Sequence, residues 1–87
     1  MKNNWGLNEG QQQVIYIGSE RPVVVDNAGA GTISLSYKRM GGDNPRPAKK
    51  IYPGNIVAVE AEEVSLKGDP DGSSGAWWFQ DRPVRND

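Results

Sequence analysis

The sequence predicts an all-β domain: a small antiparallel β-sandwich or barrel of six to seven short strands, with no significant helix. Short runs of β-branched and aromatic residues recur along the 87 residues, and turn-forming residues separate them. The 11 glycines and 6 prolines make up about a fifth of the chain, against about an eighth in an average protein. No stretch of about ten or more residues has apolar side chains at helical spacing between capping residues.

The N-terminal residues 1–13 are expected to form a polar arm ahead of a single β domain at residues 14–80. Trp5 and Leu7 are apolar residues in an arm rich in asparagine and glutamine. Two interpretations stay open: the pair folds back on its own domain, or it inserts into a neighbouring subunit. Residues 81–87 are expected to form a polar C-terminal tail.

In the first half of the domain, Val14–Ile17 is a β-branched and aromatic run that predicts a strand ending at Gly18. Val23–Asp26 predicts the next strand, and the glycine-containing residues 27–31 predict a turn rather than a phosphate-binding loop. Thr32–Lys38 alternates strictly between apolar and polar side chains, which predicts an antiparallel strand with one buried face.

In the second half, residues 39–53 contain repeated glycine and proline and are expected to form a long loop. Residues 55–61 predict a central strand because both of its faces are apolar, and residues 64–66 are expected to continue it after a bulge. Asp69–Gly72 predicts a turn. Residues 75–80 predict the last strand.

The composition argues against enzyme chemistry. The chain has no cysteine and no histidine, which excludes a cysteine nucleophile, thiolate metal sites and the most common general base. We expect no catalytic residue, no cofactor and no metal site. Asp69 and Asp71, with Ser73, carry oxygens at alternate positions, and the sequence leaves open whether they bind a cation.

The charge balance also limits the partners. Ten basic and eleven acidic residues give a net charge of −1, which disfavours a dedicated binder of nucleic acid or of an anionic membrane. No signal peptide and no apolar run of about 20 residues is present, so we expect synthesis in the cytoplasm and no membrane segment.

Charged residues form two groups of opposite sign. Residues 38–50 carry a net charge of +4 and residues 60–71 a net charge of −4. Three interpretations are open. Both segments are solvated loops, or the basic loop of one subunit meets the acidic segment of the next, which would fix the register of a homo-oligomer. In the third, the basic loop contacts nucleic acid, although no aromatic residue lies among its basic residues to stack on a base. The candidate contact residues are Arg39, Arg46, Lys49, Lys50, Glu60, Glu62 and Glu63.

Two adjacent tryptophans occupy the last predicted strand. Trp77 and Trp78 must point to opposite faces, with Phe79 on the side of Trp77. Three interpretations are open: both rings are core, one anchors a protein interface, or one forms a carbohydrate platform. We take Trp78, together with Trp5 and Leu7, as a candidate interface residue. The sequence does not decide which of the two tryptophans is buried.

Three segments together, residues 23–37, 52–61 and 74–78, resemble small all-β modules of virion surface proteins in tailed bacteriophages, of the head-decoration or fibre type. The resemblance lies in the style of strands and turns rather than in a signature motif. It implies a cysteine-free module that folds in the host cytoplasm, forms a trimer or sits at a capsid symmetry axis, and ends on the virion surface.

The function expected from the sequence is therefore a non-enzymatic structural protein: a homo-oligomeric phage virion component that contacts itself, with a trimer favoured, and a capsid or other virion protein. One alternative is a carbohydrate-binding module that uses Trp77 or Trp78 with Tyr37 or Tyr52. Another is a small inhibitor that blocks a host protein through the charged loops. The strand order, the symmetry and the partner do not follow from the sequence.

Overall fold

Six strands form one sheet in the computed structural model, which describes residues 2–39, 49–68 and 71–81. The strands are β1 (Asn3–Leu7), β2 (Gln12–Asn27), β3 (Ile33–Lys38), β4 (Lys49–Ile51), β5 (Ile56–Gly68) and β6 (Ser73–Phe79). Their order is β1-β6-β2-β5-β3-β4, and every neighbouring pair is antiparallel. The described residues contain no helix. The prediction of an all-β antiparallel domain is confirmed.

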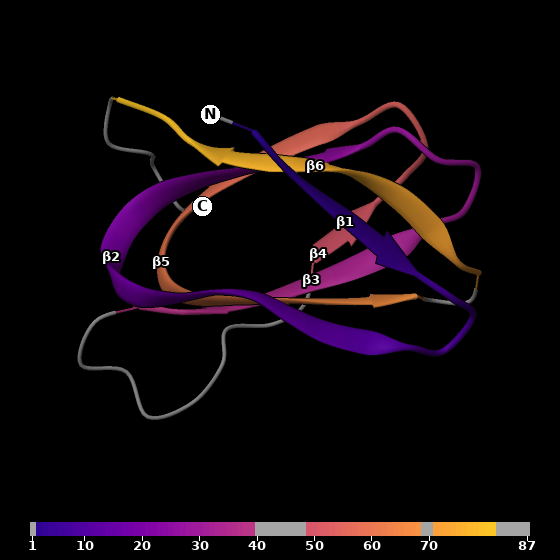
Figure 1. Ribbon diagram of the computed structural model, residues 1–87, viewed down its shortest axis with the longest axis horizontal. Helices are drawn as coiled ribbons and strands as arrows, with labels where there is room; N and C mark the ends of the chain where they lie inside the picture. The colour runs from indigo at the N-terminus through magenta and orange to yellow at the C-terminus, as the bar shows by residue number, and fades with distance from the viewer. Residues whose placement is uncertain (1, 40–48, 69–70, 82–87) are drawn as a thin grey trace.

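The sheet folds over on itself because its two longest strands bend. Figure 1 shows β2 and β5 turning back at the same side of the molecule. The second half of β2 pairs with β6 and with the first half of β5, whereas the first half of β2 pairs with the second half of β5. One sheet thereby supplies two facing layers. The first layer contains β1, β6, the second half of β2 and the first half of β5. The second layer contains the first half of β2, the second half of β5, β3 and β4.

Irregular pairing accommodates the bend. On β2, residues 18–20 lie between the pairs Ile17–Glu63 and Arg21–Ala61, where β5 has Glu62 alone. The extra residues let β2 take the wider path around β5, as Figure 1 shows. A second irregularity falls at Ile15, between the pairs Val14–Ser65 and Tyr16–Val64. It leaves Ile15 and Tyr16 both packed against the core.

Several elements differ from those expected from the sequence. The expected N-terminal arm contains β1, which pairs with β6 along its whole length. The two runs Val14–Ile17 and Val23–Asp26 belong to one strand, β2, because Gly18 marks the bend and not the end of a strand. The expected loop 39–53 contains β4. Its residues 40–48 lie outside the described part of the chain, as do residues 82–87 of the expected tail.

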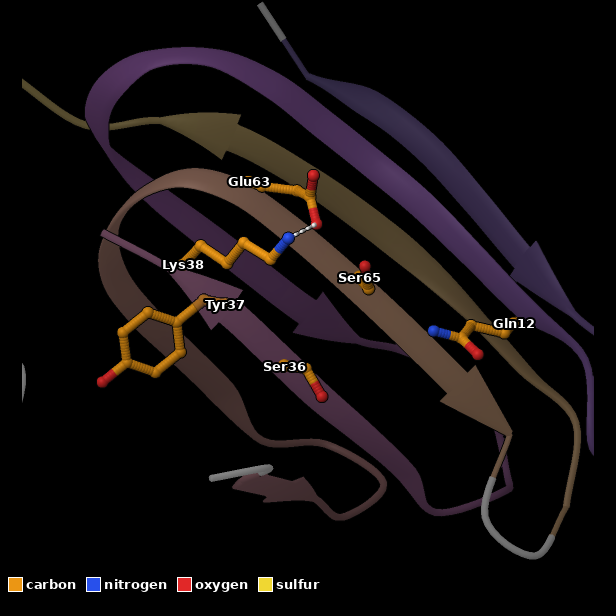
Figure 2. A pocket seen from close by; sticks show the side chains of 6 residues that line it. All are labelled: Gln12, Ser36, Tyr37, Lys38, Glu63 and Ser65. Carbon is orange, nitrogen blue, oxygen red and sulfur yellow. Dashed lines mark ion pairs between the residues drawn. The ribbon is translucent and has the colours of Figure 1, made fainter. Parts of the chain in front are cut away.

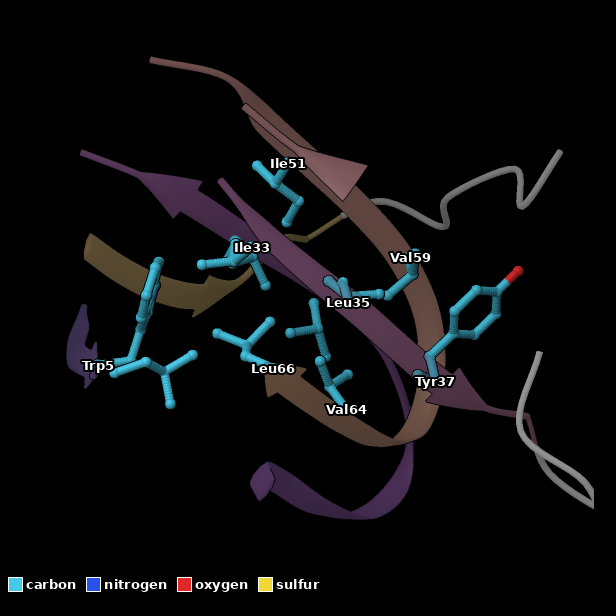
Figure 3. Close-up of a cluster of buried hydrophobic side chains, with 12 residues drawn as sticks. Trp5, Ile33, Leu35, Tyr37, Ile51, Val59, Val64 and Leu66 are labelled. Atoms are coloured by element: carbon cyan, nitrogen blue, oxygen red, sulfur yellow. The ribbon is translucent and has the colours of Figure 1, made fainter. Parts of the chain in front are cut away.

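The core lies between the two layers (Figure 3). The face of β3 predicted to be buried is buried, as the fully enclosed Ile33 and Leu35 show. On β5, Leu66 is fully enclosed, whereas Ile56, on one of the two faces noted as apolar, is 60% exposed. Trp5 is 4% exposed, and its indole N–H lies 3.2 Å from the carbonyl oxygens of both Asp26 and Ala76. Leu7 also belongs to this core. Of the two interpretations of Trp5 and Leu7, the structure therefore supports the one in which the pair folds back on its own domain.

Asn27 joins the ends of three strands. Its side-chain N–H groups donate to the carbonyl oxygens of Gly31 at 2.8 Å and Ile51 at 2.9 Å. Its side-chain oxygen accepts from the hydroxyl of Ser73 at 2.6 Å and from the backbone N–H of Gly29 at 3.2 Å. The side chain has no exposed surface. An amide carries both donors and acceptors, so this buried site is satisfied in a way that an apolar side chain cannot reproduce.

We expect Asn27→Asp to lower the free energy of unfolding by about 3 kcal/mol, because a buried carboxylate would face the two carbonyl oxygens that now accept hydrogen bonds. The measurement is urea denaturation followed by tryptophan fluorescence. The exposed Asn55→Asp is the matched control, with an expected change within about 0.5 kcal/mol. Equal stability of the two variants would contradict the role assigned to Asn27.

Candidate interaction surfaces

The two adjacent tryptophans lie on opposite faces of β6. Trp77 packs against the core, with its ring centroid 6.0 Å from Tyr16 and 5.4 Å from Phe79. The guanidinium of Arg21 lies 3.6 Å from the centroid of Phe79 and covers that ring. Trp78 is half-buried on the outer face, where the ammonium of Lys2 lies 4.5 Å from its ring centroid. Of the two rings, Trp78 is the one on the outer surface of the sheet.

The carbohydrate interpretation gains little from this geometry. Tyr37, one of its two tyrosine candidates, is 6% exposed and belongs to the core. Tyr52 is exposed at the turn between β4 and β5. A sugar stacks on the open face of an aromatic ring, and on Trp78 it would meet the ammonium of Lys2.

The oppositely charged segments meet within one chain. Lys38 at the end of β3 lies 3.7 Å from Glu63 on β5, because the two residues are cross-strand partners. Arg39 lies 3.4 Å from Glu20 at the bend of β2. Both contacts leave the side chains partly exposed, so each contributes at most about 1 kcal/mol to stability. Arg39 and Glu63 therefore each have an ion-pair partner in their own chain. A contact of these segments between subunits stays a prediction.

The other charged candidates are spread over the surface. Lys49 lies 5.8 Å from the centroid of Tyr37, and Lys50 is exposed beside it on β4. Glu60 and Glu62 are partly buried near the bend of β5. Arg46 lies outside the described residues. The structure thus does not gather the described candidates into one patch, and Trp5 and Leu7, both in the core, are unavailable to a partner.

A shallow polar pocket of about 160 Å³ lies on the outer face of the second layer (Figure 2). Ser36 and Ser65, which are cross-strand partners, form part of its lining. The ion pair of Lys38 with Glu63 and the amide of Gln12 complete its polar groups. These groups can hydrogen-bond a polar side chain of a partner.

Beside this pocket, the first half of β2 presents two apolar side chains that the sequence interpretation did not single out. Val14 is 51% and Ile17 is 73% exposed. They are the ladder partners of Ser65 and Glu63, so they border the outer face that carries the pocket. The signal in the sequence was the unbroken apolar run Val14–Ile17, which leaves apolar side chains on both faces of the strand.

Two further properties concern the described residues alone. Within residues 2–39, 49–68 and 71–81, no group of three or more histidine, cysteine, aspartate or glutamate side chains is placed to hold a metal ion. Asp69 lies outside this part, so a cation site with Asp71 stays untested. Over the same residues, no helix has the length and apolar character needed to cross a membrane.

No protein-family model and no curated protein matches the sequence. Among solved structures, the fold is similar to that of the Drosophila melanogaster CENP-C cupin domain, with a TM-score of 0.71 and 10% identity over 92% of this chain and 60% of that one. A structure of Drosophila melanogaster CENP-C bound to CAL1 gives a TM-score of 0.72 at 10% identity, over 92% of this chain and 65% of that one. The chain spans less than two thirds of the length of these structures.

These similarities define the class of fold. The folded-over antiparallel sheet is cupin-like, and an identity of 10% carries the likeness no further than the fold. The resemblance to virion modules of bacteriophages stays a prediction.

We expect Trp5→Ala to lower the free energy of unfolding by about 3–5 kcal/mol, because it removes a fully packed ring from the core. Trp78→Ala, the matched change on the outer face, is expected to cost about 1 kcal/mol, since that ring is half-buried. Urea denaturation followed by far-UV circular dichroism measures both. A larger loss for Trp78→Ala than for Trp5→Ala would contradict this placement of the rings.

Proposed function

We propose that the chain is a non-enzymatic assembly module that associates with further copies of itself through protein–protein contacts. The observation that carries this proposal is the exposure of Val14 and Ile17, at 51% and 73%, on one strand half. Exposing two large aliphatic side chains to water is unfavourable, and their burial against a partner surface lowers the free energy of the system.

The size of the domain supports the proposal. A chain of 87 residues without disulfides has a small core, and association of folded copies adds stability by mass action because only the folded state binds. The trimeric state, the capsid partner and the virion surface implied by the resemblance to phage modules stay predictions. So does inhibition of a host protein.

Sedimentation equilibrium across micromolar to millimolar concentrations tests the proposal. We expect a mass that is a multiple of the 9.5 kDa chain and that falls toward the single-chain value on dilution. A mass of 9.5 kDa at every concentration would overturn the proposal.

Glycan binding is the second candidate, because Trp78 lies on the outer face of the sheet and outside the core. A sugar stacked on this ring would have to displace the Lys2 ammonium. If it holds, titration with a glycan panel will shift the tryptophan fluorescence in a saturable way, and Trp78→Ala will abolish the shift. No shift in the wild-type protein, or a shift that survives Trp78→Ala, would count against it.

A further inference from the structure

The first half of β2 is an edge of the sheet among the described strands. Along Gln12–Ile17, β2 pairs with β5 on one side, and no other described strand pairs with these residues. The backbone N–H and C=O groups of an edge strand are satisfied by water or by a further strand. Its natural protein partner is thus another strand, and the exposed Val14 and Ile17 lie on this edge.

The other edges of the sheet are less suited to such pairing. On β1, the apolar Trp5 and Leu7 point into the core, which leaves Asn4 and Gly6 outside. The short β4 carries Lys49 and Lys50, and two copies paired there would bring like charges together. The first half of β5 ends in the acidic residues 60, 62 and 63 and has the same difficulty.

The first half of β2 is free of this repulsion. No charged residue lies between Gln11 and Ser19, and proline, which also blocks edge pairing, first appears at position 22. Copies of the strand can therefore pair with each other without placing like charges opposite. A neutral edge that carries exposed aliphatic side chains fits a second copy of itself better than it fits a charged partner.

The exposed side chains define the register. Val14 and Ile17 both point to the outer face, because the irregularity at Ile15 turns Ile15 and Tyr16 toward the core. In an antiparallel pair with a two-fold axis between Ile15 and Tyr16, Val14 of each copy lies opposite Ile17 of the other. Both exposed aliphatic pairs are then covered at once, as an isologous contact requires. Glu20 would lie opposite the neutral Gln11 of the other copy.

We propose that two copies of this chain pair antiparallel along Gln12–Ile17, with Val14 of each packed against Ile17 of the other and the sheet continuous through both copies. This inference rests on the proposed function, since it presumes self-association. It specifies a two-fold dimer contact in place of the trimer expected from the sequence.

Cysteine cross-linking tests the register, because the natural chain has no cysteine. Val14→Cys and Ile17→Cys are made as separate variants, one carrying a tag that shifts its mobility on a gel. After mixing and mild oxidation, we expect disulfide-linked heterodimers on the order of tenfold above either variant oxidised alone, because a disulfide needs the two Cα atoms within about 7 Å. Ile56→Cys, at a position 60% exposed on the other layer, is the control and is expected to cross-link with neither.

A charged substitution gives an independent measurement. Val14→Lys and Ile17→Lys are each expected to weaken association on the order of tenfold or more, because the second copy would bury an ammonium group. Ile56→Lys is the matched change and is expected to leave the association constant unchanged. Circular dichroism of each variant shows that the fold is retained, as expected at exposed positions.

The outcomes separate this inference from the proposed function. A wild-type oligomer whose Val14→Cys and Ile17→Cys variants form no heterodimer, or whose Val14→Cys variant links mainly to itself, would overturn the pairing while leaving self-association standing. Association unchanged by Ile17→Lys would do the same. A wild-type protein that stays a single chain at all concentrations would overturn both.

Discussion

The bend shared by β2 and β5 is the constraint on which the rest of the structure depends. A flat sheet of six strands in a chain of this length would leave one apolar face in water, since no helix among the described residues covers it. By folding the two longest strands over, the protein makes one sheet serve as both walls of its core (Figure 1). The additional residues 18–20 on β2 make the bend possible. At the C-terminal end of β2, the side chain of Asn27 is hydrogen-bonded to Gly31, Ile51 and Ser73 and so holds the strand ends together.

How much of this fold the sequence reveals depends on the range of each interaction. The alternation in Thr32–Lys38 reports a buried face directly, so β3 is predicted almost residue by residue. The bend is different, because Gly18 looks the same whether it ends a strand or lets one turn. β1 also cannot be predicted from the local sequence, because the indole N–H of Trp5 donates to carbonyl oxygens 21 and 71 residues away in the sequence. Contacts of that separation leave no local pattern.

The candidate site shows the same limit more sharply. The sequence contains two segments of opposite net charge, but it does not show that β3 and β5 are neighbours. Because they are, Lys38 forms an ion pair with Glu63 of the same chain. Of the residues expected to contact a partner, Trp5 and Leu7 fill the core instead. Val14 and Ile17 look like ordinary strand residues until the pairing of β2 is known. Exposure is a property of the strand's place in the sheet, which the sequence of the strand alone does not contain.

The same bend also determines which part of β2 lies at an edge of the sheet. A strand that bends from one layer into the other is central in one half, between β6 and β5, and an edge in the other half, where β5 is its described partner. Folding the sheet to build a core therefore creates a new edge at the first half of β2. The chain leaves this edge neutral from Gln11 to Ser19, without the charges and prolines that commonly protect edges from pairing. The same bend that makes a small core possible thus also creates the edge along which we propose that a second copy pairs.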